Sequence, residues 1–367
     1  STLLPANGTY CFSNLFSDTY SVKITTTVPG AIGTIAPNAS VTNGWLNTGD
    51  SLGNNNGTGG GFLTTGNLDS IRVVVGTTNV TGVDFGIERA PLANNVTAAN
   101  QVNPGGNHTV IVPTLNGSDP EQGIFTGISN LDTIVIKTLP SNATLYYDFG
   151  AGPVPIVLGV NDTIKNYNPS LLTIDPNSGA IVVTFDYIEV DAALVGSNIA
   201  HVTMPFTTLN LSGNVFNDAN GLADGIVNGT GVKGSDIDAV VTGLQPLYAQ
   251  LLTGGTLVAT VPVQEDGTYS FPGLDAGNYT VVINQSSTGA SIAPSLPANW
   301  VNTGEYVGTG VGNDGVPANG TLSNILLSVT DIANVNFGIE QAPIADPKND
   351  TDHINPGGVV QVIVPTL

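Results

Sequence analysis

The sequence predicts an all-β chain of tandem β-sandwich modules, and three observations support this fold class. Short runs rich in β-branched and aromatic residues follow one another closely, as at residues 131–137, 180–185, 209–216 and 280–283. The 46 Gly and 23 Pro among 367 residues supply turns between such runs. Long strings of sequence also recur at a nearly constant spacing, which is typical of a repetitive architecture.

The repeat is longer than any single module. Phe-Gly-Ile-Glu, Trp-x-Asn-Thr-Gly and Gly-Thr-Tyr-x-Phe each occur twice, at offsets of 252 (337 − 85), 255 (300 − 45) and 259 (267 − 8). The paired segments are residues 85–88 and 337–340, 45–49 and 300–304, and 8–12 and 267–271. The period predicts a two-module unit, of which the sequence holds about one and a half copies. We therefore expect this chain to be a window on a longer repetitive protein.

Four modules follow one another in this interpretation. The first module, residues 1–89, is the C-terminal part of one sandwich; the second, 90–208, is a sandwich of another kind; the third, 209–341, is a complete copy of the first kind; and the fourth, 342–367, begins another of the second kind. Pro91 and Pro343 lie where one module passes to the next. Such short Pro-containing linkers are expected to restrict hinge bending.

Charge and hydropathy exclude several classes of protein. The formal net charge is −21, with only seven Lys and Arg, so the basic surface needed for nucleic-acid binding is missing. An anionic membrane surface is an equally poor partner, and no apolar run reaches the ~20 residues of a membrane-spanning helix. Because 41% of residues are hydrophobic and only 10% charged, the chain can bury substantial cores. The single cysteine, Cys11, is expected to be a packed small apolar residue.

The third module carries a specific set of motifs. These are Ser-Gly-Asn-Val-Phe-Asn-Asp-Ala-Asn-Gly at 212–221, Asp-Gly-Thr-Tyr-Ser-Phe at 266–271, Gly-Asn-Tyr-Thr-Val at 277–281 and Asn-Phe-Gly-Ile at 336–339. With them the module resembles the B-type repeat domain of serine-aspartate repeat surface proteins (SdrD-B-like), a relative of the Cna-B stalk domains. The resemblance implies a prealbumin-like sandwich.

The second module resembles a different group. It contains Asn-Tyr-Asn-Pro at 166–169, Leu-Thr-Ile-Asp-Pro at 172–176 and Val-Thr-Phe-Asp-Tyr at 183–187. With these strings it looks like the immunoglobulin-like or cadherin-like repeats found beside such domains in giant bacterial surface adhesins.

One loop of the third module suggests calcium. Asp218, Asn220, the backbone of Leu222, and Asp224 occupy positions one, three, five and seven of an EF-hand-like loop, and oxygens at alternate positions can converge on one Ca²⁺. The resembled family binds calcium at this loop. Here position five is not a carboxylate, and position twelve is Gly229 instead of a bidentate acid. The alternative is an Asx-rich turn that satisfies its own backbone.

A second set of acids lies in the second module. The expected interpretation is that they are solvated surface acids; the alternative is that, as acids do in cadherin-like repeats, they gather at one end of the sandwich around Ca²⁺. The set comprises Asp119, Glu121, Asp175, Asp186, Glu189 and Asp191. Glu88 and Glu340 each precede a Pro-containing linker, where an ion could brace the joint.

One short string resembles an enzyme motif, but its context does not indicate an enzyme. Gly-Asp-Ser-Leu at residues 49–52, together with Asp350 and His353, spells the signature of a lipase and esterase family. In that family the nucleophilic serine must lie on a strand-to-helix turn of an α/β fold. Here the serine would be Ser51, and no helical pattern follows it. The other copy reads Gly-Glu-Tyr-Val at residues 304–307, so we expect no enzyme.

Several positions match glycosylation signals. Asn142 and Asn278 begin N-x-Thr sequons, and Ser70, Thr133 and Thr163 lie in Asp-Ser/Thr-aliphatic strings that resemble O-glycan acceptors of gliding Gram-negative bacteria. The sequons also suit Asn-rich turn chemistry. A glycosylated surface is the corresponding expectation.

The expected function is structural. The pattern favours a stalk segment of a very large secreted cell-surface adhesin or extracellular filament, acting as a semi-rigid spacer whose neighbours are further repeats or like chains. One alternative is a carbohydrate- or protein-binding adhesion module, for which residues 54–62 are the candidate loop. Another is a filament subunit whose partial sandwiches are completed by neighbouring chains.

Overall fold

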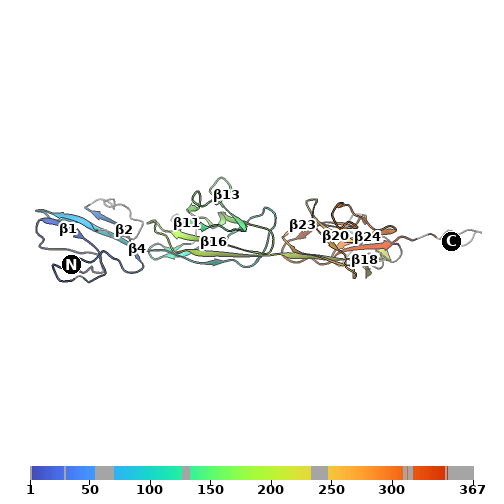
Figure 1. Cartoon of the computed structure of the whole chain (residues 1–367), viewed down its shortest axis with the longest axis horizontal. Helices are drawn as coiled ribbons and strands as arrows, with labels where there is room; N and C mark the ends of the chain where they lie inside the picture. The colour runs from blue at the N-terminus through green and yellow to red at the C-terminus, as the bar shows by residue number, and fades with distance from the viewer. Residues whose placement is uncertain are drawn as a thin grey trace, which may run out of the picture. The chain divides into compact units, whose positions relative to one another are not determined.

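The computed structural model describes residues 2–28, 30–53, 70–125, 133–232, 247–308, 312, 317–343 and 345. The fold is nearly all β, as predicted, and in the described residues two short 3₁₀ helices interrupt the strands (Figure 1). Packing divides the chain into an N-terminal unit, residues 1–101 and 106–206, and a C-terminal unit, residues 102–105 and 207–367. In the described part, no helix is long and apolar enough to cross a membrane.

The first module contributes two small antiparallel sheets to the N-terminal unit. Its strands are β1 (Asp18–Val22), β2 (Trp45–Leu52), β3 (Ile71–Val75) and β4 (Val83–Arg89). β1 pairs with β3, and β2 pairs with β4. Within the described residues, neither pair has a third strand.

The second module has three sheets, in the orders β10-β9-β5, β14-β11-β16-β17-β6 and β13-β12-β15-β8. The strands are β5 (Leu92–Ala93), β6 (Val96–Thr97), β7 (Gln101–Val102), β8 (Val110–Ile111), β9 (Gly117–Asp119), β10 (Gly123–Phe125), β11 (Thr133–Thr138), β12 (Ala143–Asp148), β13 (Pro153–Pro155), β14 (Thr163–Lys165), β15 (Leu172–Pro176), β16 (Ile181–Val190) and β17 (Ala200–Thr207), with η1 (Pro169–Leu171) before β15. β16 alternates buried and more exposed residues, as a sandwich strand must. Its inward face includes Val183, Phe185 and Tyr187.

The C-terminal unit contains the complete copy. Its strands are β18 (Leu209–Asn217), β19 (Thr230–Gly231), β20 (Tyr248–Thr253), β21 (Thr256–Pro262), β22 (Thr268–Leu274), β23 (Gly277–Asn284), β24 (Trp300–Val307), β25 (Thr321–Leu327) and β26 (Val335–Gln341), with η2 (Gly221–Asp224) after β18. One sheet runs β19-β18-β26-β24 and the other β21-β20-β23-β25, while β22 also pairs with β18.

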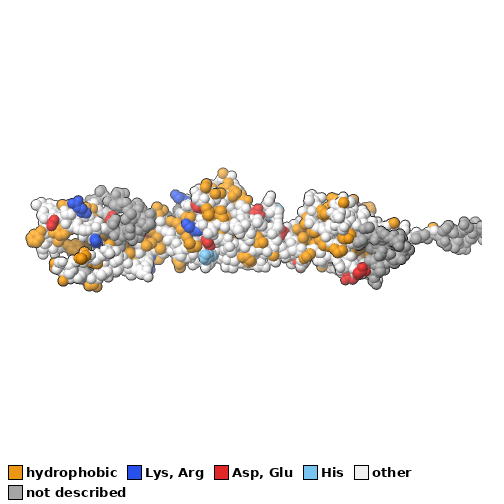
Figure 2. Space-filling view, viewed as in Figure 1, with side chains coloured by type: hydrophobic (Ala, Val, Ile, Leu, Met, Phe, Trp, Pro, Cys, Tyr) orange, Lys and Arg blue, Asp and Glu red, His pale blue; other side chains and the backbone are white. Residues whose placement is uncertain are grey.

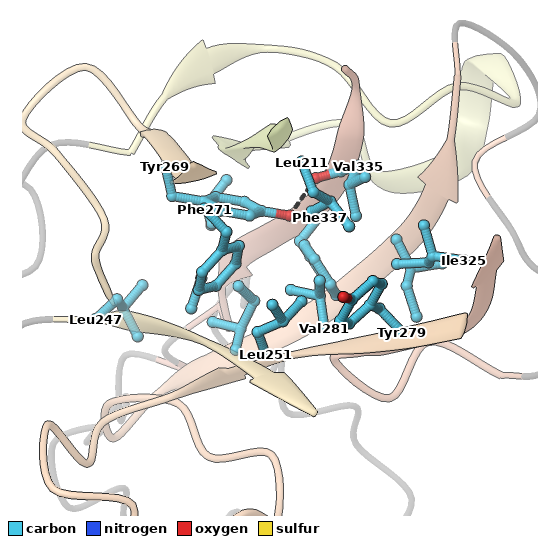
Figure 3. Packing of buried hydrophobic residues seen from close by; sticks show 14 of the residues in the cluster. Leu211, Leu247, Leu251, Tyr269, Phe271, Tyr279, Val281, Ile325, Val335 and Phe337 are labelled. Carbon is cyan, nitrogen blue, oxygen red and sulfur yellow. Dashed lines mark hydrogen bonds between the residues drawn. The ribbon is translucent and has the colours of Figure 1, made fainter. Parts of the chain in front are cut away.

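The core of this unit lies between the two sheets. Figure 3 shows Tyr269 and Phe271 from β22 packed with Phe337 from β26 and with side chains of β20 and β23. The Tyr269 hydroxyl donates to the Val335 carbonyl, so its only polar atom is satisfied inside the core. Trp300 is also buried here, consistent with a core residue and not with a sugar-stacking platform.

The sequence repeat is also a repeat of strand pairing. Trp45 lies opposite Arg89 in the first module as Trp300 lies opposite Gln341 in the third, and Gly49 pairs with Gly86 as Gly304 pairs with Gly338. Both ladders shift register at the same place, between Asn47 and Gly49 and between Asn302 and Gly304. The same local sequence therefore forms the same irregular ladder twice.

Candidate functional site

The predicted calcium loop begins directly after β18 with a buried acid. Asp218 is fully buried, and its backbone N–H donates to the Ile339 carbonyl at 2.9 Å. Its Oδ2 accepts from the Thr303 hydroxyl at 2.8 Å. No described donor reaches Oδ1, although a buried carboxylate oxygen normally has a partner. This oxygen is therefore the strongest feature of the site.

Asn220 and Asp224 are exposed, whereas Leu222 is partly buried. Asn220 precedes η2, which contains Leu222 and ends in the left-handed Gly225. Asp224 uses its two oxygens locally: Oδ1 accepts from the Ile226 N–H at 3.0 Å and Oδ2 from the Asn228 amide at 2.8 Å. These bonds correspond to the Asx-rich turn that was the alternative to calcium.

The pKa values of Asp218 and Asp224 are shifted in opposite directions. Burial raises the pKa of Asp218, the Thr303 hydroxyl lowers it, and the charges of Asp224 and Glu340 raise it further. Hydrogen bonds, chiefly from Asn228, lower the pKa of Asp224. Asp224 is therefore an anion at neutral pH, and the Asp218 carboxylate lacks a counter-charge that a cation would supply.

A Ca²⁺ ion fits the chemistry of this loop. Among the described residues, no three acidic, histidine or cysteine side chains converge as metal ligands. Calcium, however, also accepts amide and backbone oxygens and water. A carboxylate oxygen of Asp218 with no donor, the side chains of Asn220 and Asp224, and the Leu222 carbonyl give a donor set of the appropriate kind.

Close packing explains the glycine of the repeated Phe-Gly-Ile-Glu string. A Cβ on Gly338 would lie 2.4 Å from the Thr303 Oγ1 and 2.6 Å from the Asp218 Oδ2. In the first module, a Cβ on Gly86 would lie 2.6 Å from the Thr48 Oγ1. A threonine therefore packs against this glycine in both copies.

The second predicted set of acids gathers only in part. Asp119 and Asp191 are buried, and each raises the pKa of Glu88, as does the charge of Glu121. Asp119 Oδ1 accepts from the backbone N–H groups of Glu121 and Gln122 at 2.8 and 2.6 Å. These acids thus cluster around Glu88, the residue that precedes the last residue of β4.

Two members of the predicted set lie elsewhere. Asp175 is on β15 opposite Thr144, and Asp186 on β16 contacts the His201 Nδ1 at 2.5 Å. Asp186 points to the opposite face of β16 from Glu189, because the two residues are three positions apart (189 − 186). Neither Asp175 nor Asp186 is among the charges that raise the pKa of Glu88.

Glu88 and Asp191 form a carboxyl pair. Glu88 Oε1 and Asp191 Oδ2 are buried, and no described donor reaches either oxygen. Burial raises the pKa of Glu88 to about 7, with the nearby Asp191 as the next cause. Burial also raises the pKa of Asp191, whose Oδ1 accepts from the Val195 N–H at 2.8 Å. Two carboxyl groups this close can share a hydrogen bond only when one of them holds a proton.

Arg89 follows Glu88 in the chain, and its side chain contacts Glu121 and Trp45. Its Nε lies 3.5 Å from Glu121 Oε1, and its guanidinium lies 5.5 Å from the centre of the Trp45 ring. Trp45 is thus covered by a cation in the described structure, an arrangement that stabilises both side chains.

Cys11 corrects another expectation. The side chain is exposed, not packed. Cys11 lies between Tyr10 and Phe12, and its counterpart in the third module is Ser270, which is also exposed. A serine at the equivalent position was the available signal, because alternate residues of an extended segment face opposite ways.

The remaining predicted positions are surface features or fall outside the described residues. Ser70, Thr163 and Asn278 are exposed, Thr133 is half-buried on β11, and the Asn142 side-chain amide donates to the Val182 carbonyl at 3.0 Å. Ser51 of the esterase-like string lies on β2 opposite Asp84. Asp350, His353 and the loop 54–62 lie outside the described residues.

Comparisons with known proteins give weak structural similarities. No protein-family profile and no curated protein matches the sequence. Among solved structures, the chain is similar to BcpA, the major pilin subunit of Bacillus cereus, with 12% identity over 75% of this chain and 81% of that one, at a TM-score of 0.31. The T6 backbone pilin of serotype M6 Streptococcus pyogenes matches at 8% identity over 74% and 77%, with a TM-score of 0.26.

A third similar structure is the Bacillus anthracis TIE protein, at 10% identity and a TM-score of 0.27. The match covers 68% of this chain but only 40% of that protein. At these identities and scores, the similarities do not establish a shared function.

Proposed function

We propose that this chain is a repeating structural segment of an extracellular surface protein, in which SdrD-B-like sandwiches alternate with immunoglobulin-like or cadherin-like ones and act as spacers. The observation that carries this proposal is the duplicated β2–β4 and β24–β26 ladder, with the same register and the same shift, on either side of a different module. A spacer built from modules requires that each module has its own core, because each core stabilises only its own module.

The linkers and the surface support this role. β4 ends at Arg89 and β5 begins at Leu92, so only Ala90 and Pro91 connect the first module to the second. Such a short link containing proline limits bending between modules. On the face drawn in Figure 2, charged side chains are scattered without forming one large patch. A net charge of −21 would keep neighbouring chains from adhering.

We further propose that Ca²⁺ stabilises the third module at the Asp218 loop. Asp218, Asn220 and Asp224 would hold the ion through side-chain oxygens, and Leu222 through its carbonyl. When bound, the ion would supply the positive charge that the Asp218 carboxylate lacks. The protein's own part is to bury Asp218 beneath Thr303 and hold it in place.

A ligand-binding adhesion module is the second candidate, because the C-terminal unit has a groove of about 550 Å³. Among the described residues, its lining includes Ser212, Asn214, Gln264, Thr268 and Asn334 and no charged side chain. Tyr269 also lines it but is buried and bonded to Val335, so it offers no exposed ring for sugar stacking. The groove therefore suits a spacer surface better than a carbohydrate site.

Binding measurements separate the two roles. The full chain, labelled at the exposed Cys11, would be applied to an array of glycans and to extracellular-matrix proteins. A spacer should give no saturable binding at micromolar concentration. Saturable binding that is lost on Asn214→Ala or Gln264→Ala in the groove would instead assign the adhesive role to this segment.

A further inference from the structure

A short segment that lies in the second module by sequence belongs to the C-terminal unit by packing. Residues 102–105 group with that unit, although the residues on either side of them, up to 101 and from 106, group with the N-terminal unit. The segment reads Val-Asn-Pro-Gly. The chain therefore passes between the two units at three places, after residues 101, 105 and 206.

Strand pairing leads the chain to this position. β6 runs parallel to β17, with Val96 opposite Val202, and β7 also pairs with β17. The Asn103 N–H then donates to the carbonyl of Thr207, the last residue of β17, at 2.8 Å. Only Thr208 separates β17 from β18. The 102–105 segment therefore begins next to the point where the chain enters the third module.

The backbone of Asn103 is bonded on both sides. Its N–H is used by Thr207, and its carbonyl accepts from the Ala276 N–H at 2.8 Å, in the turn between β22 and β23. Asn103 is fully buried, a position in which backbone groups require such partners. Its side-chain Oδ1 accepts from the Gly105 N–H at 3.1 Å, which fixes the turn through Pro104.

The segment also makes an apolar contact with the C-terminal unit. Val102 packs against the hydrophobic cluster that contains Phe271 and Leu274. Val110, eight positions further along (110 − 102), packs instead against the cluster of the N-terminal unit. An apolar side chain stabilises the core against which it is buried. Two valines of the same module thus stabilise different cores.

The turn that receives the segment has its own support and fits closely. The Tyr279 hydroxyl donates to the Asp275 carbonyl at 3.0 Å, which holds the turn between β22 and β23. Gly105 is buried against this turn. A Cβ on Gly105 would lie 2.8 Å from the Asp275 Cβ and 3.0 Å from the Ala276 carbonyl oxygen, and its φ of +64° is in the left-handed region. Both the contact and the backbone conformation therefore require glycine here.

We propose that the β22–β23 turn of the third module is a docking surface whose partner is an apolar-Asn-Pro-Gly segment of the module that precedes it, here Val102–Gly105. The docked segment couples the two modules at a second place besides the β17–β18 connection. The string Ile-Asn-Pro-Gly-Gly recurs at residues 354–358, while the residues that flank it differ from those at 101 and 107. This inference holds whether or not the modules act as spacers.

Two valine variants of the full chain test the docking. Val102→Ala should lower the melting temperature of the C-terminal unit by about 2–4 °C, because it removes an apolar contact with the core of that unit. Val110→Ala, the matched control, should lower the melting temperature of the N-terminal unit instead. Hydrogen–deuterium exchange in residues 133–176 and 268–284 assigns each transition to its unit. The proposal is overturned if Val102→Ala destabilises the N-terminal unit or neither unit.

Two glycine variants test the fit of the segment against the turn. Gly105 and Gly106 share the left-handed backbone, with φ of +64° and +62°, so alanine strains both positions alike. A Cβ on Gly106 would meet only the His108 Cδ2, at 3.6 Å, and not the turn. In Gly105→Ala the Ala276 N–H should therefore lose its protection from hydrogen exchange, and in Gly106→Ala it should keep it. Equal protection of Ala276 in the two variants, or equal loss, would contradict docking at this turn.

Discussion

The carboxyl pair of Glu88 and Asp191 is the residue-scale feature with the clearest solution signature. One acid comes from β4 of the first module and the other follows β16 of the second. The pair therefore links two modules that are adjacent in sequence, and its energetic effect depends on a proton.

The pair predicts a pH dependence of stability. The pKa of Glu88 is raised from 4.5 to about 7, so between those values the folded chain keeps a proton that the unfolded chain has released. The free energy of unfolding of the N-terminal unit should therefore increase as the pH falls through about 7 and level off near 4.5. In calcium-free buffer, thermal unfolding at pH 8 and at pH 5.5 measures this.

Glu88→Gln is the matched control. Its amide can donate to Asp191 at any pH, so the variant should melt a few degrees above the natural chain at pH 8 and close to it at pH 5.5. A difference in melting temperature that is the same at both pH values would show that Glu88 does not titrate in this range.

Asp218 supports a prediction about cations. Millimolar CaCl₂ should raise the melting temperature of the C-terminal unit, and EDTA should reverse the effect, because the bound ion favours the folded state by mass action. Asp218→Asn should abolish the response, while Glu265→Gln, a change at an exposed acid outside the loop, should retain it. If calcium and EDTA leave the natural chain unchanged, the Asx-rich turn is the correct interpretation.

The sequence identified some of these residues and missed others for physical reasons. Asp218 could be predicted as a candidate because the residues that would bind a Ca²⁺ ion in its loop are neighbours in sequence. The partnership of Glu88 with Asp191 could not, because it depends on packing across 103 positions (191 − 88). Cys11 was misassigned because cysteine is usually buried, whereas Cys11 is exposed, as its counterpart Ser270 is in the other copy.

At the scale of elements, two equivalent glycines should respond differently to the same substitution. A Cβ on Gly304 of β24 would lie 2.2 Å from the Gly312 carbonyl oxygen, while none of the described atoms lies within 4 Å of a Cβ on Gly49 of β2. Gly304→Ala should therefore cost about 1–3 kcal/mol of stability in the C-terminal unit. Gly49→Ala should be neutral or slightly stabilising, since alanine reduces the entropy of the unfolded chain.

Denaturant unfolding of the Gly304→Ala and Gly49→Ala variants, monitored by hydrogen–deuterium exchange in each unit, tests this prediction. An equal loss of stability at both positions would mean that the surroundings of β2 match those of β24.

Strand prediction succeeded where a partner strand is present and failed where it is not. The runs at residues 209–216 and 280–283 lie within β18 and β23. The repeat leads one to expect a strand at residues 9–15, as in β22, but none forms. Local sequence specifies the tendency to extend, while the ladder is completed only by a neighbour.

At the scale of the whole molecule, separate cores are the basis of the spacer role. One hydrophobic cluster lies between residues 93 and 206 and another between 209 and 339. Destabilising one should leave the other folded, as in other tandem arrays. A Phe337→Ala change should therefore lower the melting transition of the C-terminal unit by several degrees, with a cost of about 3–5 kcal/mol, and leave exchange in residues 133–206 unchanged.

Length measurement is the most direct test of the spacer role. Chains with one, two and three copies of the 252-residue repeat (337 − 85) would be compared by small-angle X-ray scattering at physiological salt. Short Pro-containing linkers between folded modules predict that the maximum dimension grows by an equal increment with each added repeat. A maximum dimension that grows only as the square root of the repeat number, or a compaction of the longer chains, would contradict a semi-rigid spacer.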